Sequence, residues 1–289
     1  MNAVVQGILL GGLYALFACG LSLLFGVMRI INLAHGDIAV LGAFLIWTVV
    51  HQTAISPFVA TALILPVALA IGYVLHLAML DRSLRSGPLI PLLTTFGLAI
   101  VIQNLLLQVY SPDVKSLATN AGSITTFSWQ ITDQLSISGL GALTLALAVA
   151  VLGGLQIFLS RTPMGREMRA TAEDADTAEL VGVNARAVYA RATAIAVAIA
   201  FLAGGFMALR STFEPSSGPT QLIFAFEAVV IGGFGSLWGT LAGGIVLGVA
   251  QTIGAEINPQ YSIIAGHLVF LAVLALPRSG ILAGRLARA

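Results

Sequence analysis

Long uninterrupted apolar segments dominate the chain and restrict it to very few folds. A helix needs about 20 apolar residues to cross the hydrocarbon core of a membrane, and seven segments of this chain approach that length. They lie at residues 4–27, 38–54, 57–80, 89–110, 137–160, 191–211 and 261–277. A further apolar stretch, 221–256, is interrupted by GGFGSLWG at 232–239, whose glycines favour a hairpin or a broken helix. We therefore predict an all-α polytopic membrane protein with eight or nine transmembrane helices.

The composition agrees with a membrane protein and excludes several other classes. Of the 289 residues, 58% are hydrophobic and 9% are charged, against roughly 25% charged residues in an average soluble domain. The net charge of +1 gives no indication of a nucleic-acid partner. Cys19 is the single cysteine, so no internal disulfide can form, and the four histidines lack the spacing of metal ligands. We expect no cofactor, no metal site and no nucleic-acid partner.

The basic residues indicate which loops face the cytoplasm, because Lys and Arg are enriched on that side of a membrane. Arg82 and Arg85 share one loop, five arginines lie between residues 161 and 191, and three lie in the C-terminal tail. We expect these three stretches to be cytoplasmic, and the loop at 111–136, with Lys115 as its only base, to lie outside with the N-terminus. Residues 1–28 lack a basic region before their apolar run, so we interpret them as a retained membrane segment and not a signal peptide.

The loop at residues 161–191 holds ten of the 25 charged residues of the chain. Its run EMRATAEDADTAELVGV favours helix and alternates in charge, so two short helices at the membrane surface would fit. One interpretation is a solvated connection between two spans. The other follows from a resemblance, because Asp176, Ala178 and Gly182 are spaced like the EAA-x3-G core of importer permeases of the ATP-binding-cassette class. In those proteins a short cytoplasmic helix docks into the ATPase subunit; the downstream hydrophobic-Pro element of the motif is missing here.

Three stretches resemble the branched-chain amino acid importer permeases of the LivH type. GLYALFACGLSLLFGVMRIINLAHGDIAVLGAF, residues 12–44, is similar to the N-terminal signature of that family. TPMGREMRATAEDADTAELVGVN, residues 162–184, resembles its cytoplasmic region, and AFEAVVIGGFGSLWGTLAGG, residues 225–244, resembles its glycine-rich C-terminal hairpin. The three occur in the family's order, so the resemblance covers nearly the whole chain. Asp37 stands where the family has Glu as often, which keeps the charge and shortens its reach.

This resemblance implies a single transmembrane permease domain, residues 1–289, in a bacterial inner membrane. It implies two cytoplasmic ATP-binding subunits, a second homologous permease that is expected to be a paralogue in a heterodimer, and a periplasmic binding protein. The chain contains no Walker A pattern GxxxxGK(S/T), so ATP must be hydrolysed by another polypeptide and we expect no catalytic residues here. Alternating access is the implied mechanism, with movement entering through a coupling loop, 161–191, at Gly165, Arg166, Arg169, Asp176, Ala178 and Gly182.

Four polar residues stand close together between the first two apolar segments: Arg29, Asn32, His35 and Asp37. A charged group inside a membrane span costs roughly 3 kcal/mol or more, so such groups face protein or water and not lipid. We predict that residues 26–37 form a bent or re-entrant element that lines the inner end of the pathway, with Arg29 or His35 as the partner of Asp37. The alternative is an interfacial turn, in which Arg29 reaches the membrane surface and Asp37 caps the following helix.

Other polar residues lie within apolar segments. Thr94, Thr95 and Gln103 lie in the segment at 89–110, and Glu227 lies just before the glycine-rich break. We predict that they line the translocation pathway, because a branched-chain substrate suits apolar walls while its ammonium and carboxylate need a few polar groups. The alternative for the segment at 89–110 is hydrogen bonding between helices; for Glu227 it is a hydrogen bond from one neighbouring helix.

Two other classes of function are open at this point. An ion-coupled secondary carrier would need no ATPase, and Asp37 or Glu227 would carry its proton or sodium ion. An intramembrane enzyme would have to use His35 and Asp37, but residues two apart on a helix point to different faces. The charged loop and the resemblance favour the importer. The substrate stays open between branched-chain amino acids and urea, short amides or other small carboxylates.

Overall fold

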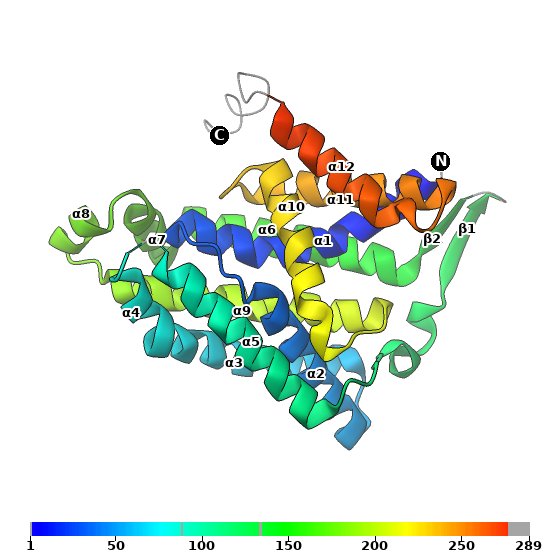
Figure 1. Ribbon diagram of the computed structural model, residues 1–289, viewed down its shortest axis with the longest axis horizontal. Helices are drawn as coiled ribbons and strands as arrows, with labels where there is room; N and C mark the ends of the chain where they lie inside the picture. The colour runs from blue at the N-terminus through cyan, green and yellow to red at the C-terminus, as the bar shows by residue number, and fades with distance from the viewer. Residues whose placement is uncertain (1, 88, 133–134, 277–289) are drawn as a thin grey trace.

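Twelve α-helices make up most of the chain, for which the computed structural model describes residues 2–87, 89–132 and 135–276 (Figure 1). The α-helices are α1 (Asn2–Met28), α2 (His35–Thr53), α3 (Pro57–Leu75), α4 (Asp81–Leu84), α5 (Ile90–Tyr110), α6 (Gly139–Arg161), α7 (Pro163–Glu173), α8 (Ala175–Leu180), α9 (Ala185–Arg210), α10 (Gly218–Gly232), α11 (Leu237–Ile257) and α12 (Tyr261–Ala275). Shorter elements are the π-helix η1 (His76–Leu80), the 3-10 helices η2 (Ala118–Thr125) and η3 (Pro215–Ser217), and the strands β1 (Ser128–Thr132) and β2 (Leu135–Ser138).

Seven of the described helical units are long and apolar enough to cross a membrane. They are α1, α2, α5, α6, α9, α11 and the continuous unit of α3, η1 and α4. Helices α10 and α12 have 15 residues each. At about 1.5 Å per residue they are roughly 22 Å long, against a hydrocarbon core of about 30 Å. The polytopic helical fold is confirmed, and the predicted eight or nine spans are reached only when these shorter helices are counted.

Helices α1 and α9 form the centre of the molecule, because 83% of the most apolar window of each is buried, against 22% for α5 and α6. Helix α1 packs on α6, α9, α10 and α11. Its contact with α11 is backbone to backbone: a Cβ atom on Gly248 would lie 2.3 Å from the carbonyl oxygen of Gly7. Small residues permit such close packing where lipid removes the hydrophobic drive between helices.

A β-hairpin interrupts the otherwise helical fold. Strands β1 and β2 pair antiparallel within the predicted external loop, at the opposite end of the molecule from α7 and α8 (Figure 1). The Gln6 side chain donates from Nε2 to the Ser136 carbonyl oxygen at 2.7 Å, which ties the hairpin to the start of α1. The expectation of an all-α protein therefore missed this sheet, although the run FSWQIT at 127–132 alternates apolar and polar residues with the period of a strand.

The glycine-rich break predicted at 232–239 is present. Helix α10 ends at Gly232 and α11 begins at Leu237, where the Ser236 side chain accepts a hydrogen bond from the Gly239 N–H at 3.1 Å. The turn lies against the last part of α1, because the Phe234 and Phe25 rings are 4.2 Å apart between centroids. Helix α10 crosses steeply over α1 (Figure 1). The break therefore joins two helices at the same end of the molecule as Met28.

Candidate functional site

The chain reverses direction after α1 and returns into the protein. Helix α1 ends at Met28, Arg29 adopts a left-handed conformation with φ 54°, and the next helix begins at His35. The His35 ring nitrogen Nε2 lies 2.8 Å from the carbonyl oxygen of Phe17, which is 11 residues before Met28 and thus about 16 Å back along the helix axis. Residues 29–34 therefore run back along α1 toward the middle of the molecule (Figure 1).

Hydrogen bonds hold this re-entrant segment, residues 29–34, in place. The Thr95 hydroxyl of α5 accepts a hydrogen bond from the Leu33 N–H at 3.1 Å. The side-chain oxygen Oδ1 of Asn32 accepts one from the Ala34 N–H at 3.0 Å. Asn32 is 1% exposed, yet its amide nitrogen Nδ2 has no hydrogen-bond partner among the described residues. The segment is thus rigidly supported while one buried donor stays available.

Asp37 lies where the N-terminal ends of two helices meet. It is in the first turn of α2 and 2% exposed. A Cβ atom on Gly218, the first residue of α10, would lie 2.0 Å from Asp37 Oδ1, and one on Gly36 would lie 2.0 Å from the Gly218 carbonyl oxygen. Helix N-termini carry partial positive charge, so both helices stabilise an anion at this point.

The predicted partners of Asp37 are wrong. His35 bonds to the α1 backbone, and within the described part of the chain neither His35 nor Arg29 forms an ion pair or hydrogen bond with Asp37. Its Oδ1 atom has no hydrogen-bond partner there, and the residue at the N-cap of α2 is Ala34, so Asp37 does not cap this helix either. A buried carboxylate oxygen without a partner is costly, so packing alone does not explain a carboxylate at this position.

The predicted residues of α5 separate into two groups. Thr95 is fully buried and contacts the re-entrant segment, whereas the Thr94 hydroxyl donates to the Ile90 carbonyl oxygen of its own helix at 2.8 Å. Gln103 is half-buried and lies eight residues beyond Thr95, about 12 Å further along the axis. The structure therefore brings Asn32, His35, Asp37 and Thr95 together and does not bring Gln103 to them.

Glu227 forms a second buried polar position, on α10. Its carboxylate is 4% exposed and Oε1 is paired with Nδ1 of His267 on α12 at 2.5 Å. This is the hydrogen bond to a neighbouring helix that the sequence left as an alternative. The second oxygen, Oε2, is buried with no partner among the residues described.

Sequence reasoning missed two buried polar contacts between helices. One joins His267 to Glu227, and the other runs from the Tyr14 hydroxyl to Gln251 Oε1, between α1 and α11. Gln251 was visible as a lone amide within an apolar segment, which is the signal that could have identified it. Its partner is 237 residues away in sequence, and no local pattern connects the two.

The coupling loop contains the two predicted short helices, α7 and α8. The Thr162 hydroxyl accepts from the Gly165 N–H at 3.0 Å and starts α7. The Asp174 carboxylate starts α8 by accepting from the Thr177 N–H at 3.1 Å and the Thr177 hydroxyl at 2.6 Å. These hydrogen bonds, the hydroxyl first, hold the pKa of Asp174 below its usual range.

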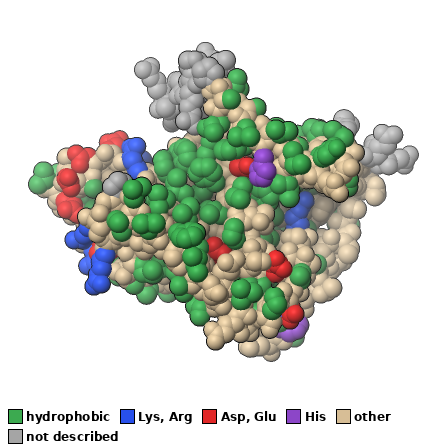
Figure 2. All heavy atoms as spheres, in the orientation of Figure 1, with side chains coloured by type: hydrophobic (Ala, Val, Ile, Leu, Met, Phe, Trp, Pro, Cys, Tyr) green, Lys and Arg blue, Asp and Glu red, His purple; other side chains and the backbone are tan. Residues whose placement is uncertain are grey.

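The end of the molecule formed by α7 and α8 presents a charged surface with an apolar tip (Figure 2). Leu180 and Val181, at the end of α8, are 87% and 78% exposed. Gly182 follows with φ 90°. Of the other predicted coupling residues, Gly165 and Ala178 are buried and Arg166, Arg169 and Asp176 are exposed.

Ion pairs connect the coupling loop to the spans. Arg186 at the start of α9 pairs through Nε with Asp81 Oδ2 of α4 at 3.1 Å, and Arg85 pairs with the other oxygen at 3.3 Å. Arg191 of α9 pairs with Glu167 of α7 at 3.2 Å. Helix α9 begins six residues earlier than predicted, because Asn184 caps it, and this extension places Arg186 in the first turn of the helix.

The pair of Asp81 and Arg186 is expected to stabilise the joint between α4 and α9. Asp81→Asn and Arg186→Gln should each lower the Tm of the purified protein, and the double variant should lower it by less than the sum. Because Arg186 is half exposed, we expect a coupling energy of about 0.5–1 kcal/mol. Asp113→Asn, which removes an exposed pair with Lys115, is the control and should change nothing. If the decreases in Tm of the two single variants simply add in the double variant, Asp81 and Arg186 do not stabilise each other.

The fold and the site define a multi-pass helical membrane protein with a buried polar break and a charged loop at one end. The family described as "Branched-chain amino acid transport system / permease component" matches residues 3–275, and the chain belongs to it. It is therefore the permease component of a branched-chain amino acid ABC transport system, a transmembrane subunit without catalytic activity. This confirms the resemblance found in the sequence and sets aside the secondary carrier and the intramembrane enzyme.

Curated relatives match over almost the full chain. The permease protein BraD of Pseudomonas aeruginosa is 30% identical over 98% of this chain and 95% of its own length. LivH of Salmonella typhimurium is 28% identical over 98% of this chain and 95% of its own. LivM of the same organism is 24% identical over 92% of this chain and 67% of its own. All three are described as permease proteins of high-affinity branched-chain amino acid transport systems.

Proposed function

We propose that the chain forms one half of the membrane pathway of an ATP-driven importer of branched-chain amino acids in a bacterial inner membrane. Its partners in this proposal are two cytoplasmic ATP-binding subunits, a second homologous permease and a periplasmic binding protein. Similarity to both LivH and LivM, two permease proteins of one organism, supports a heterodimer of paralogues. The whole chain, 1–289, acts as a single permease domain.

The proposed orientation places the coupling loop and the C-terminus in the cytoplasm and the N-terminus outside. Helix α4, the coupling loop and the start of α9, which carry basic residues, lie at one end, and the β-hairpin lies at the other (Figure 1). Helices α10 and α12 are then shorter membrane elements that complete nine crossings, the odd number that termini on opposite sides require. The C-terminal arginines that supported this orientation lie at 278–288, outside the described residues.

The proposed translocation site is built around the meeting point of α2 and α10. The single observation that carries it is the buried polar break with two unpartnered atoms, Asn32 Nδ2 and Asp37 Oδ1. Asp37 is the group for the substrate ammonium, while Asn32 Nδ2 and the two helix N-termini are donors for its carboxylate. His35 and Thr95 position the segment, and Glu227, Thr94 and Gln103 extend the pathway along α10 and α5.

The proposed mechanism is alternating access. ATP binding and hydrolysis move the ATPase subunits, and the exposed tip at Leu180 and Val181 receives that movement. The ion pairs of Asp81 with Arg186 and of Glu167 with Arg191 pass it to α4 and α9. The spans then open outward or inward in turn, as rigid bodies that rearrange around a fixed site.

Co-purification with transport tests this function. The tagged chain, extracted in mild detergent from its own membranes, should retain two ATP-binding subunits and a second permease, identified by mass spectrometry. The purified complex in vesicles should take up leucine in the presence of ATP and the binding protein. Competition by isoleucine and valine, but not by urea or acetamide, would establish the substrate class. Uptake by the chain alone, without ATP, would contradict the proposal.

A further inference from the structure

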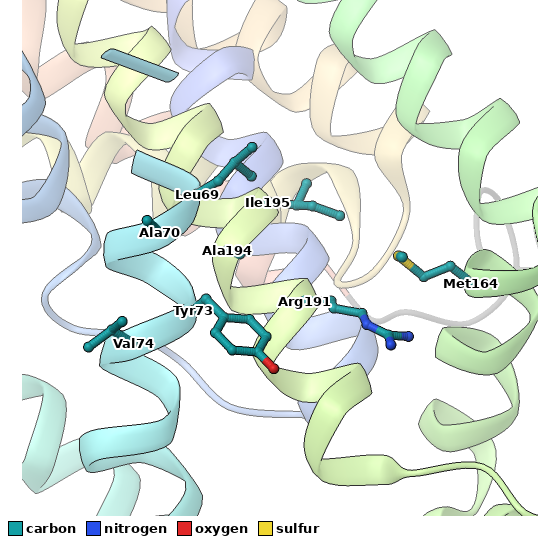
Figure 3. A pocket seen from close by; sticks show the side chains of 8 residues that line it. All are labelled: Leu69, Ala70, Tyr73, Val74, Met164, Arg191, Ala194 and Ile195. Carbon is teal, nitrogen blue, oxygen red and sulfur yellow. The ribbon is translucent and has the colours of Figure 1, made fainter. Parts of the chain in front are cut away.

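A groove opens on the side of the molecule between α3, α9 and α7. It has a volume of about 460 Å³, and Figure 3 shows its lining side chains from these three elements. Leu69 and Val74 of α3, Ile195 of α9 and Met164 of α7 make the wall apolar. Leu69 and Val74 are 42% and 62% exposed, so within the described residues the groove is open to its surroundings.

Polar groups are confined to one part of the groove. Arg191 is the charged residue of the lining, and the Tyr73 hydroxyl points to the same part of the groove as its guanidinium (Figure 3). Arg191 is six residues inside the start of α9, about 9 Å along the axis, while Leu69 lies 12 residues before Asp81, about 18 Å deep. The polar part is therefore near the membrane surface and the apolar part reaches into the hydrocarbon.

The charge on this groove is partly compensated. Nη1 of Arg191 pairs with Glu167 Oε2 at 3.2 Å, and both side chains are 41% exposed. A guanidinium has five N–H donors in a planar fork, so one carboxylate leaves donors available for a second anion. Basic pockets between membrane helices on the cytoplasmic side bind the head groups of anionic lipids.

We propose that this groove binds an anionic phospholipid of the cytoplasmic leaflet, with its phosphate at Arg191 and an acyl chain along Leu69 and Ile195. The inference rests on the proposed function only in assigning this end of the molecule to the cytoplasm. Because the groove touches α3, α9 and the coupling helix α7, the lipid fills the joint between the coupling loop and the spans. The transporter is therefore expected to couple best in membranes that contain anionic lipid.

Lipid titration of the purified transporter complex tests the proposal. Phosphatidylglycerol and phosphatidylcholine with the same acyl chains are added in equal amounts, and bound lipid is counted by native mass spectrometry. We expect a preference of about fivefold for phosphatidylglycerol, the effect of one basic side chain on an anionic lipid. Arg191→Gln should abolish the preference and Arg191→Lys should retain it. Equal binding of both lipids by the unaltered complex would overturn the proposal.

Further variants separate charge from shape and from other anions. Glu167→Gln removes the competing carboxylate and should maintain or raise the preference. Ala70→Leu enlarges an exposed side chain of α3 that lines the groove and should reduce the binding of both lipids. If inorganic phosphate displaces the lipid, the site binds a free anion, and the proposal of a phospholipid site is wrong. Loss of ATP-dependent uptake with the lipid preference intact would count against the proposed function alone.

Discussion

Replacing Asn32 and Asp37 together with alanine is expected to reduce uptake to the background of a strain without the transporter, while the complex still assembles. Asn32 Nδ2 and Asp37 Oδ1 have no partners within the described structure, so their removal relieves two buried polar atoms and offsets the loss of the hydrogen bond from the Ala34 N–H to Asn32 Oδ1. The substrate loses its polar contacts at the meeting point of α2 and α10. Radiolabelled leucine uptake, measured with the amount of purified complex, checks both parts.

A matched control exists in α6. Thr144 is 2% exposed and its hydroxyl donates to the Leu140 carbonyl oxygen of its own helix at 2.7 Å. Thr144→Ala removes a buried polar group away from the proposed pathway and should leave uptake unchanged. Normal uptake by the Asn32 and Asp37 double variant would show that the re-entrant segment does not contact the substrate.

Replacing Gly182 with valine is expected to separate ATP hydrolysis from transport. Gly182 has φ 90° and ends α8 directly after the exposed apolar tip. A β-branched residue cannot adopt this conformation without roughly 1–3 kcal/mol of strain, so the turn rearranges and the tip is displaced. We expect ATPase activity to persist in the reconstituted complex while uptake per ATP hydrolysed falls steeply.

Gly122 provides the control for backbone strain. It also has a positive φ, 68°, and a Cβ there meets nothing within 4 Å, as at Gly182, but it lies in η2 near the β-hairpin at the other end. Gly122→Val should therefore carry similar strain and leave the ratio of uptake to hydrolysis unchanged. An unchanged ratio in Gly182→Val would remove the coupling role of this turn.

The membrane spans could be predicted from the sequence because a helix that crosses lipid must be apolar over a minimum length. This length requirement does not predict where the chain turns back into the protein. Helix α10 begins at Gly218 against Asp37, inside the protein, and its 15 residues are fewer than the roughly 20 that a crossing needs. The β-hairpin lies in the loop between α5 and α6, where the length requirement gives no information.

The site could be predicted in part, for a related reason. Polar residues in apolar segments stand out because burying them is costly, and Asn32, His35, Asp37 and Thr95 do lie together in the structure. Their partners could not be derived. His35 bonds to a backbone oxygen of Phe17, and every residue offers such an oxygen. The ion pair of Arg186 with Asp81 joins residues 105 apart in sequence, and only the folded chain brings them together.

The accessibility of the re-entrant segment tests the central claim most directly. Cys19 is the only cysteine and is fully buried, so Cys19→Ala provides a background for one introduced cysteine. Leu33→Cys, half-buried in the segment, should react with a membrane-impermeant thiol reagent from the cytoplasmic side in one nucleotide state and be protected in another. Ala39→Cys, fully buried in α2, should stay unlabelled. Protection of Leu33→Cys in every state, with uptake intact, would contradict a pathway at this segment.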